Sequence, residues 1–161
     1  MRTALTVARG FVPVTLVITV YNSAPELPEL LASIGRLRVL PSEITFTDLG
    51  STDGTVDLLR AWMPPSRIPV RVITSPGAST AVGRNLAIES SYFDHIAVTD
   101  GQVCLHPEWL ARMWTELSAG NAEFKKTIEA LQAYRSDQNL WWQVAEYSFD
   151  SFMVRSRLRS R

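Results

Sequence analysis

The stretch that decides the fold reads Thr47-Asp48-Leu49-Gly50-Ser51-Thr52-Asp53-Gly54-Thr55. Residues 43–46 before it are β-branched and aromatic enough to predict a buried strand, and residues 56–62 after it predict a helix. The carboxylate of Asp48 therefore stands where a strand ends, in front of glycines and hydroxyls that open a helix. Two interpretations fit: a ligand site at the edge of an open α/β sheet, or helix-capping residues, because Ser, Thr and Asp cap helices anywhere.

Strands and helices alternate four times along the chain. The patterns predict strands at 12–20, 43–47, 70–74 and 95–99, and helices that follow 23–26, begin near 51, contain 83–85 and span 108–117. Such alternation predicts an α/β fold, with a parallel sheet, helices on both faces and right-handed crossovers.

Polar residues stand at the carboxyl ends of the predicted strands. Tyr21 and Asn22 follow the first strand, and Asp48, Ser75 and Asp100 end or follow the other three. These residues are expected to line one edge of the sheet, where open α/β proteins bind ligands. The first strand-to-helix turn lacks a glycine fingerprint and the chain lacks GxxxxGK[ST], which disfavours a Rossmann dinucleotide site and a P-loop.

Length and composition limit the kinds of protein to which the chain can belong. The chain has 161 residues, of which 46% are hydrophobic and 20% charged, values typical of a single globular domain with its own core. The formal net charge is zero, so nothing global indicates a nucleic-acid partner. The apolar residues 11–20 are interpreted as a buried strand and not as a signal peptide. Cys104 is the sole cysteine, so no intrachain disulfide can form, and we interpret it as a small buried residue.

Several ordered motifs resemble those of a known family. They are Val14-Thr-Leu-Val-Ile-Thr-Val-Tyr-Asn22, Asp48-Leu-Gly-Ser-Thr-Asp-Gly-Thr55, Gly83-Arg-Asn85, and Asp100-Gly-Gln102 with His106-Pro-Glu-Trp-Leu110. In order and spacing they resemble family 2 glycosyltransferases of the GT-A fold over about residues 12–118, the nucleotide-binding half of such an enzyme. The resemblance implies a three-layer sandwich and transfer of a sugar from a nucleotide-diphosphate sugar, most commonly a UDP-sugar, with a divalent metal on the diphosphate.

The resemblance also implies roles for individual residues. It assigns seven residues to the nucleotide-sugar site: Tyr21, Asn22, Asp48, Ser51, Arg84, Asn85 and Asp100. Asp48 would accept a hydrogen bond from the base, and Tyr21 would border it. Arg84 and Asn85 would shape the pocket beneath the nucleotide, and Asp100, the first acid of the DxD motif, would lie near ribose and metal. A rigid carboxylate suits a base N–H, and a diphosphate requires a cation, either Arg84 or a metal.

Two departures from the family pattern concern acidic positions. Leu49 stands where the family usually has a second acid after Asp48, and Gln102 stands in place of the second DxD acid. Mn²⁺ or Mg²⁺ would thus be held by Asp100 and Gln102 only weakly, because a hard cation prefers carboxylate oxygen to a neutral amide. The nearby His106 is interpreted as a loop or capping residue and not as a ligand.

The third departure lies beyond residue 117. The acceptor-side strands and the acidic pair that provides the family's general base are not recognisable there, so no catalytic residue is predicted. Residues 118–121 indicate a helix stop or linker, residues 122–134 predict a helix, and an aromatic stretch and an Arg-rich end follow. We therefore expect a domain at 1–118 and a helical extension at 119–161. This extension would pack on the sheet, form a homodimer contact or touch a membrane surface.

Two functions remain open from the sequence. One is a glycosyltransferase, or its donor-binding half, acting on a UDP-sugar and an unknown acceptor. The alternative is a non-catalytic GT-A-like module that binds a nucleotide or a partner protein. No nucleic-acid partner is expected. The predicted location is the cytoplasm, with the Arg-rich end as the feature that would bring the protein to the inner face of the membrane.

Overall fold

The computed structural model describes residues 10–118 and the backbone of residues 142–147 and 152–157. The strands are β1 (Phe11–Val20), β2 (Leu40–Asp48), β3 (Val70–Thr74), β4 (His95–Asp100), β5 (Trp142–Tyr147) and β6 (Phe152–Arg157). The helices are α1 (Leu27–Arg36), α2 (Thr55–Ala61), the 3₁₀ turn η1 (Pro65–Arg67), α3 (Thr80–Ser90) and α4 (Trp109–Ser118).

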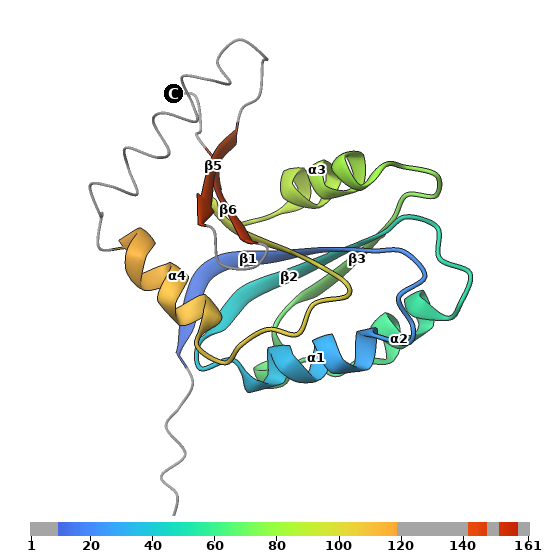
Figure 1. Ribbon diagram of the computed structural model, residues 1–161, viewed down its shortest axis with the longest axis horizontal. Coiled ribbons are helices and arrows are strands. Elements are labelled where there is room, and N and C mark those ends of the chain that lie inside the picture. The colour runs from blue at the N-terminus through green and yellow to red at the C-terminus, as the bar shows by residue number, and fades with distance from the viewer. Residues whose placement is uncertain (1–9, 119–141, 148–151, 158–161) are drawn as a thin grey trace, which may run out of the picture.

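The strands form one sheet in the order β3-β2-β1-β4-β6-β5. Strands β1 to β4 are parallel, as the alternation predicts, and the β5–β6 hairpin joins antiparallel to β4. Helices α1 and α2 cover one face of the sheet and α3 covers the other, so the molecule has three layers (Figure 1). The predicted α/β sandwich with a mainly parallel sheet is confirmed.

Alternating side chains of the central strands divide the core between the two faces. On the α1 face, Leu16, Ile18 and Phe46 are fully buried in the larger cluster, together with apolar residues of α1 and the start of α4. The α3 face has a smaller cluster: Val17, Ala87, Ile88, Ile96 and Val98. Burial of these apolar side chains is the main favourable contribution to folding.

The second strand begins earlier than the sequence predicts. The sequence predicts a strand at 43–47, but β2 starts at Leu40 and so includes Pro41 and Ser42. Opposite them, the register with β1 shifts between Val12 and Thr15, which marks a bulge. A proline is tolerated at such a strand end because the ladder is already interrupted there. The Ser42 hydroxyl donates a hydrogen bond of 2.7 Å to the carbonyl oxygen of Val12, which helps to hold this end.

Residues Ser23-Ala24-Pro25-Glu26 have the spacing of a capping box, but the start of α1 does not form one. The helix begins at Leu27, and its N-cap, Glu26, makes no side-chain capping bond. The Ser23 hydroxyl bonds instead to the backbone of Tyr21, at 3.3 Å. The carbonyl oxygen of Ser23 accepts the N–H groups of Glu26 and Leu27, so a turn precedes the helix.

The C-terminal extension is not wholly helical, which corrects the prediction for residues 142–147 and 152–157. Strand β6 pairs antiparallel with β4, from Val98 opposite Met153 to His95 opposite Ser156, and β5 pairs with β6. The physical reason is the edge of β4, whose unpaired backbone groups take up another strand readily. The helix expected at 122–134 lies outside the described residues, as do 158–161, so the homodimer and membrane contacts stay predictions.

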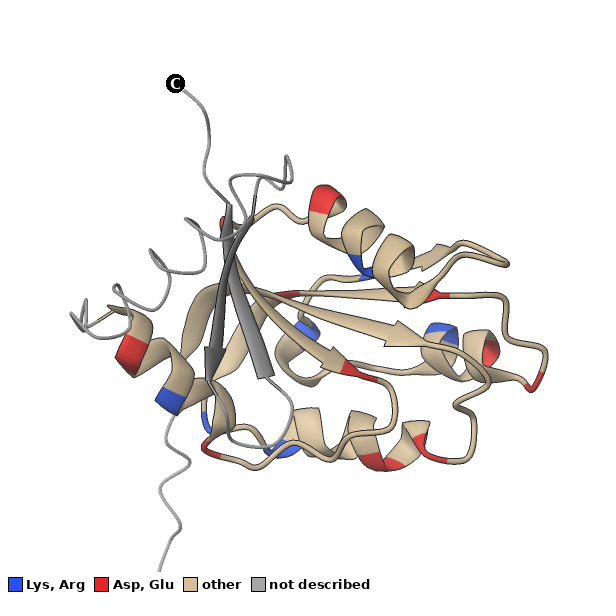
Figure 2. Ribbon diagram, turned by 45° about the horizontal axis from the view of Figure 1, so that its top comes forward, with Lys and Arg blue, Asp and Glu red and all other residues tan. Residues whose placement is uncertain are grey.

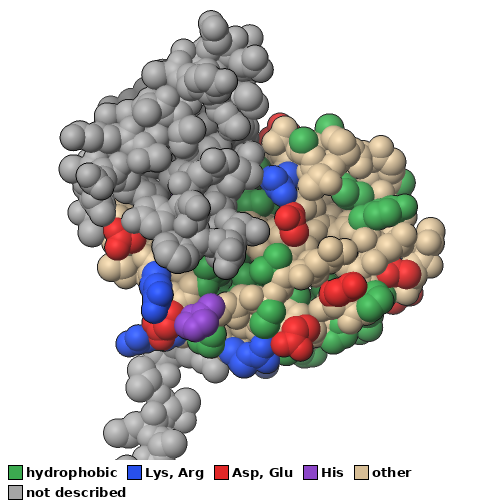
Figure 3. Space-filling model, viewed as in Figure 1, with side chains coloured by type: hydrophobic (Ala, Val, Ile, Leu, Met, Phe, Trp, Pro, Cys, Tyr) green, Lys and Arg blue, Asp and Glu red, His purple; other side chains and the backbone are tan. Residues whose placement is uncertain are grey.

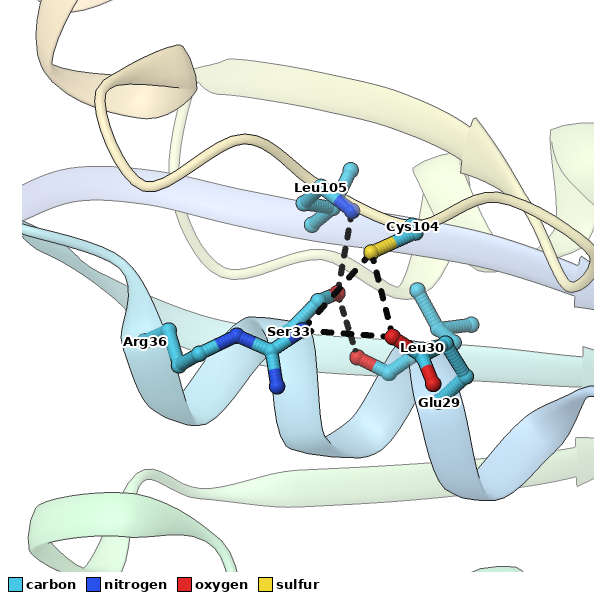
Figure 4. Close-up of polar contacts among 6 residues, drawn as sticks. All are labelled: Glu29, Leu30, Ser33, Arg36, Cys104 and Leu105. Carbon is cyan, nitrogen blue, oxygen red and sulfur yellow. Dashed lines mark hydrogen bonds and ion pairs between the residues drawn. The ribbon is translucent and has the colours of Figure 1, made fainter.

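The loop between β4 and α4 is fixed to α1 (Figure 4). The backbone N–H of Leu105 donates to the buried hydroxyl of Ser33 at 3.0 Å, and that hydroxyl donates to the carbonyl oxygen of Leu30 at 2.7 Å. Because Leu105 points inward, its neighbour Cys104 is exposed, with Sγ 3.6 Å from Glu29 Oε1. The expectation of a buried Cys104 is therefore wrong.

Charged side chains of both signs lie close together on the described part of the face shown in Figure 3, in keeping with the zero net charge. Among the ion pairs of the described residues, Nη1 of Arg38 lies 3.2 Å from Oε2 of Glu108. Among the helices of the described residues, none combines the length and the apolar character needed to cross a membrane.

Pairing of β6 with β4 predicts the effect of removing the extension. Deletion of residues 119–161 exposes the backbone of β4 as a sheet edge and should cause aggregation and loss of cooperative melting. Deletion of 158–161, which leaves β6 whole, should change neither. Calorimetry and light scattering on both variants measure these properties. A soluble, cooperatively melting 1–118 fragment would show that the hairpin is dispensable for the fold.

Candidate functional site

The candidate site lies where the strand order reverses. The chain runs outward from β1 through β2 to β3, and then returns to place β4 on the other side of β1. Open α/β sheets bind ligands in the crevice outside the carboxyl ends of the strands at such a switch point. Asp48 and Asp100 are the last residues of β2 and β4. Figure 2 shows acidic residues, in red, at the ends of strands of this sheet. The expectation that these residues share an edge is confirmed by the parallel pairing.

Asp100 is held by two side chains from different elements. Its Oδ1 atom lies 2.9 Å from Nη2 of Arg84 on α3 and accepts a hydrogen bond of 3.3 Å from the hydroxyl of Thr19 on β1. The side chain of Arg84 is only 19% exposed, whereas that of Asp100 is 55% exposed. The structure thus brings together two predicted site residues, and Asp100 is exposed to solvent at the carboxyl end of β4.

Two glycines allow the close approach of backbones around this pair. A Cβ atom on Gly101 would meet Cγ1 of Val20 at 2.8 Å, so the turn after β4 packs directly on the end of β1. A Cβ on Gly83 would meet the side chains of Leu49 and Thr47. Gly83 therefore lets α3 lie close to the end of β2, which positions the next residue, Arg84, above the sheet edge. Asn85 follows Arg84 on α3 and is half-buried.

The carboxylate of Asp48 is hydrogen-bonded to the backbone of its own loop. Its side chain is buried, with 1% exposure. Its carboxylate accepts the backbone N–H of Gly50 at 3.1 Å and that of Ser51 at 3.1 and 3.2 Å. Gly50 adopts a φ of 103°, which glycine allows at low cost. This geometry is that of a carboxylate that fixes its own loop. It is not the helix cap considered from the sequence, because α2 begins at Thr55 with Gly54 as its N-cap and has no side-chain capping bond.

The loops after β1 and β2 are hydrogen-bonded to each other. The backbone N–H of Asn22 donates to the hydroxyl of Ser51 at 2.8 Å, and the N–H of Thr52 donates to Oδ1 of Asn22 at 2.9 Å. Asn22 itself has a φ of 46°, a left-handed conformation that Asn tolerates better than most residues. Both predicted site residues, Asn22 and Ser51, therefore hold the loop that carries Tyr21, whose side chain is 57% exposed.

Asp53 makes a further link between the same loops. Its Oδ2 atom accepts the N–H of Ala24 at 2.9 Å, and its Oδ1 accepts the hydroxyl of Thr55 at 2.6 Å. The hydroxyl bond from Thr55 is the main cause that lowers the pKa of Asp53 below 3.8; the backbone N–H groups of Ala24 and Thr55 act in the same direction. Thr55 Oγ1 in turn accepts the N–H of Ser23 at 2.9 Å. The second loop thus holds the first through three side chains.

Asp100 and Gln102 are the residues that the sequence predicts to hold a metal ion. Gln102 is exposed in the turn after β4. The ring of His106 accepts the N–H of Glu108 through Nδ1 at 3.2 Å, at the beginning of α4. His106 is therefore the capping residue that the sequence indicates. Over the described residues, no group of three or more His, Cys, Asp or Glu side chains could hold a metal ion.

Sequence reasoning missed three residues that build the site: Thr19, Gly101 and Asp53. Thr19 stands opposite Asp100 in the β1–β4 register. The alternation of strands and helices does not predict which strands are neighbours, so the sequence could not indicate this contact. Gly101 is recognisable only once β1 lies next to it. Asp53 stood in the motif but was interpreted as part of the helix start. Its spacing two residues before Thr55 is the signal that could have indicated a local hydrogen bond.

The sequence over residues 15–157 matches the family model described as glycosyl transferase family 2. The chain belongs to this family. The matched segment extends past residue 118 and includes β5 and β6, so the family pattern continues further than the motifs indicated.

A curated relative and several solved structures resemble this family 2 chain. Glycosyltransferase AglE of Haloferax volcanii is 28% identical over 142 residues, 83% of this chain and 47% of AglE. The chain thus spans about half the length of this relative. The crystal structure of S. aureus TarS 1-349 has a TM-score of 0.58 at 19% identity, over 66% of this chain and 32% of TarS 1-349.

Two other solved structures carry nucleotide ligands. TarS 1-349 is known in complex with UDP, with the same TM-score of 0.58 and 19% identity over 66% of this chain and 32% of that one. Mannosyltransferase PcManGT from Pyrobaculum calidifontis, in complex with GDP-Man and Mn²⁺, has a TM-score of 0.53 at 23% identity, over 62% of this chain and 32% of its own. These similarities support the fold of the described residues.

The lowered pKa of Asp53 predicts a pH-dependent contribution to stability. A carboxyl whose pKa is lower in the folded chain stabilises the fold above its unfolded value, here 3.8, and this contribution disappears as the pH falls through the folded value. Asp53→Asn should therefore lower the melting temperature at pH 7, and the difference from the wild type should narrow at a pH of about 3. Thermal melts of the wild type and the variant between these two pH values measure the difference in melting temperature.

Asp57→Asn is the matched control, because Asp57 is exposed in the first turn of the next helix, α2. It should lower the melting temperature at pH 7 less than Asp53→Asn does. Equal effects of the two substitutions, or a difference for Asp53→Asn that is independent of pH, would contradict the role given to Asp53.

Proposed function

We propose that this chain is the donor-binding part of a glycosyltransferase, which binds a nucleotide-diphosphate sugar at the carboxyl edge of the sheet. In the reaction, the bond between the anomeric carbon and the diphosphate breaks, and the nucleoside diphosphate leaves with the electron pair. The oxygen of an acceptor hydroxyl forms the new bond to the anomeric carbon and gives its proton to a base. The observation that carries the proposal is the membership of family 2 together with the Arg84–Asp100 pair at the switch point.

Three side chains at this edge support the proposed position of the nucleotide. Tyr21 is exposed at the end of β1 and offers an aromatic face for a base. Asp100 is exposed at the end of β4, within reach of ribose or diphosphate, and Arg84 beside it is the cationic group. We propose a UDP-sugar as donor. UDP and GDP-Man are ligands of the structural relatives TarS and PcManGT, which supports a nucleoside diphosphate as the ligand class.

The base-reading role of Asp48 is part of the proposal in a modified form. An ionised carboxylate has about four lone-pair sites, and the N–H groups of Gly50 and Ser51 take up part of them. Asp48 therefore acts first by fixing the loop, and a hydrogen bond to the base would add to that role. Asn22 and Ser51 are positioning residues, because their bonds to each other's loop hold Tyr21 in place.

Affinity for UDP tests the proposed site. Tyr21→Ala should weaken UDP binding by about 1–3 kcal/mol, the energy of one base stacked on an aromatic side chain. Tyr92→Ala is the matched control: Tyr92 is also an exposed tyrosine, but it precedes the amino end of β4, away from the proposed site. Isothermal titration calorimetry with UDP, GDP and dTDP gives the affinities and the preferred base.

The calorimetry also has outcomes that contradict the proposal. A wild type that binds none of the three nucleotides in the presence or absence of Mn²⁺ would refute a donor site on this chain. Equal losses for Tyr21→Ala and Tyr92→Ala would refute the position of the base. Nucleotide binding at this edge without release of UDP from any UDP-sugar would favour the non-catalytic alternative.

A further inference from the structure

The donor set at the DxD position does not fit a divalent cation. Asp100 is followed at the second acidic position by Gln102, a neutral amide. The ring of His106 accepts the Glu108 N–H through Nδ1. No cluster of three metal-ligating side chains exists within the described residues. Hard cations such as Mg²⁺ and Mn²⁺ bind mainly to oxygen ligands, with carboxylates to balance their charge, and Asp100 is the only carboxylate of this motif.

Asp100 is also already bound to a cation, the guanidinium of Arg84. The two groups are 2.9 Å apart, and Thr19 donates to the same carboxylate oxygen. A metal ion at Asp100 would have to displace Arg84 or lie beside its positive charge. Because the side chain of Arg84 is four-fifths buried, its charge is weakly screened by water, which makes such a neighbour unfavourable.

We propose that this chain binds the diphosphate of its donor without a divalent cation, and that the guanidinium of Arg84 supplies the positive charge. The inference rests on the proposed function. A guanidinium presents five N–H donors in a planar fork that matches phosphate oxygens. The bond from Nη2 to Asp100 uses one of these five donors, and 19% of the Arg84 side chain stays exposed. Nε has no hydrogen-bond partner in the described structure, but it is buried, so a second anion would meet the other donors of the guanidinium.

Asp100 has a different task in this arrangement from the one it has in a metal site. It is a positioning residue that holds the Arg84 side chain at the end of β1, next to Thr19. Its negative charge also repels a diphosphate placed against Arg84. The two accounts thus predict opposite effects of removing this charge: a metal site loses its ligand and binds worse, whereas the arginine site gains net positive charge and binds better.

The experiment is calorimetry with UDP in EDTA and in Mn²⁺, on the wild type and three variants of the full chain. The wild type should bind UDP with an affinity that Mn²⁺ changes less than about threefold. Arg84→Gln should weaken binding by roughly tenfold or more, as loss of a charged hydrogen bond does. Asp100→Asn, which keeps the size of the side chain, should strengthen binding by about two- to fivefold.

Gln102→Asp completes the set, because it restores the second carboxylate of the motif. It should make UDP binding dependent on Mn²⁺, which the other variants should not do, and electron paramagnetic resonance of Mn²⁺ should detect the bound ion only in this variant. Thermal melts confirm that each variant is folded. If Arg84→Gln fails to fold, Asp100→Asn still separates the two accounts by the sign of its effect.

Several results would overturn the inference. Strong dependence of the wild type on Mn²⁺ that disappears in Asp100→Asn would show that Asp100 holds a metal ion. Equal loss of UDP binding by Asp100→Asn in EDTA and in Mn²⁺ would contradict the role given to the charge of Asp100. If UDP binds in Mn²⁺ but not in EDTA, the inference is contradicted and the proposed function still stands. Absence of UDP binding in both conditions would contradict the proposed function and the inference together.

Discussion

The parallel pairing of β1 with both β2 and β4 is the constraint on which the rest of the structure depends. Its register sets Val20 opposite Asp48 on one side and Thr19 opposite Asp100 on the other. Side chains alternate between the faces of a sheet, so a slip of one residue would turn Asp100 away from Arg84 and α3. The buried residues of β1, such as Leu16 and Ile18, oppose that slip because it would reverse the apolar face.

Local hydrogen bonds order the loops at the carboxyl edge of the sheet, and the side chains that make them are polar. Three side chains of the loop after β2, those of Ser51, Asp53 and Thr55, accept N–H groups of the loop after β1. A ligand that binds there meets loops that are already ordered, which lowers the entropic cost of binding. At the end of β4, the charge of Arg84 is offset by that of Asp100. The affinity for an anion therefore depends on how freely Arg84 can turn to it.

The sequence predicted the parallel α/β core and the edge at which polar residues meet, because periodicity and strand ends are local properties. It did not predict that β6 pairs with β4, since a pairing between residues 95–98 and 153–156 is set by the tertiary structure. It also assigned Asn22 and Ser51 to ligand contacts. Their hydrogen bonds to each other's loops became visible only when β1 and β2 were side by side.

The central claim is that a nucleoside diphosphate binds where the strand order reverses, between the ends of β1 and β4. Changes in backbone amide NMR shifts during titration with UDP test it most directly. The account predicts that the largest shift changes occur at residues 20–24, 49–52, 83–85 and 100–102. The amide signals of Ser42 and Tyr92, at the opposite edge near the amino ends of the strands, should keep their shifts. Saturable changes centred on the opposite edge, or spread evenly over the chain, would contradict it.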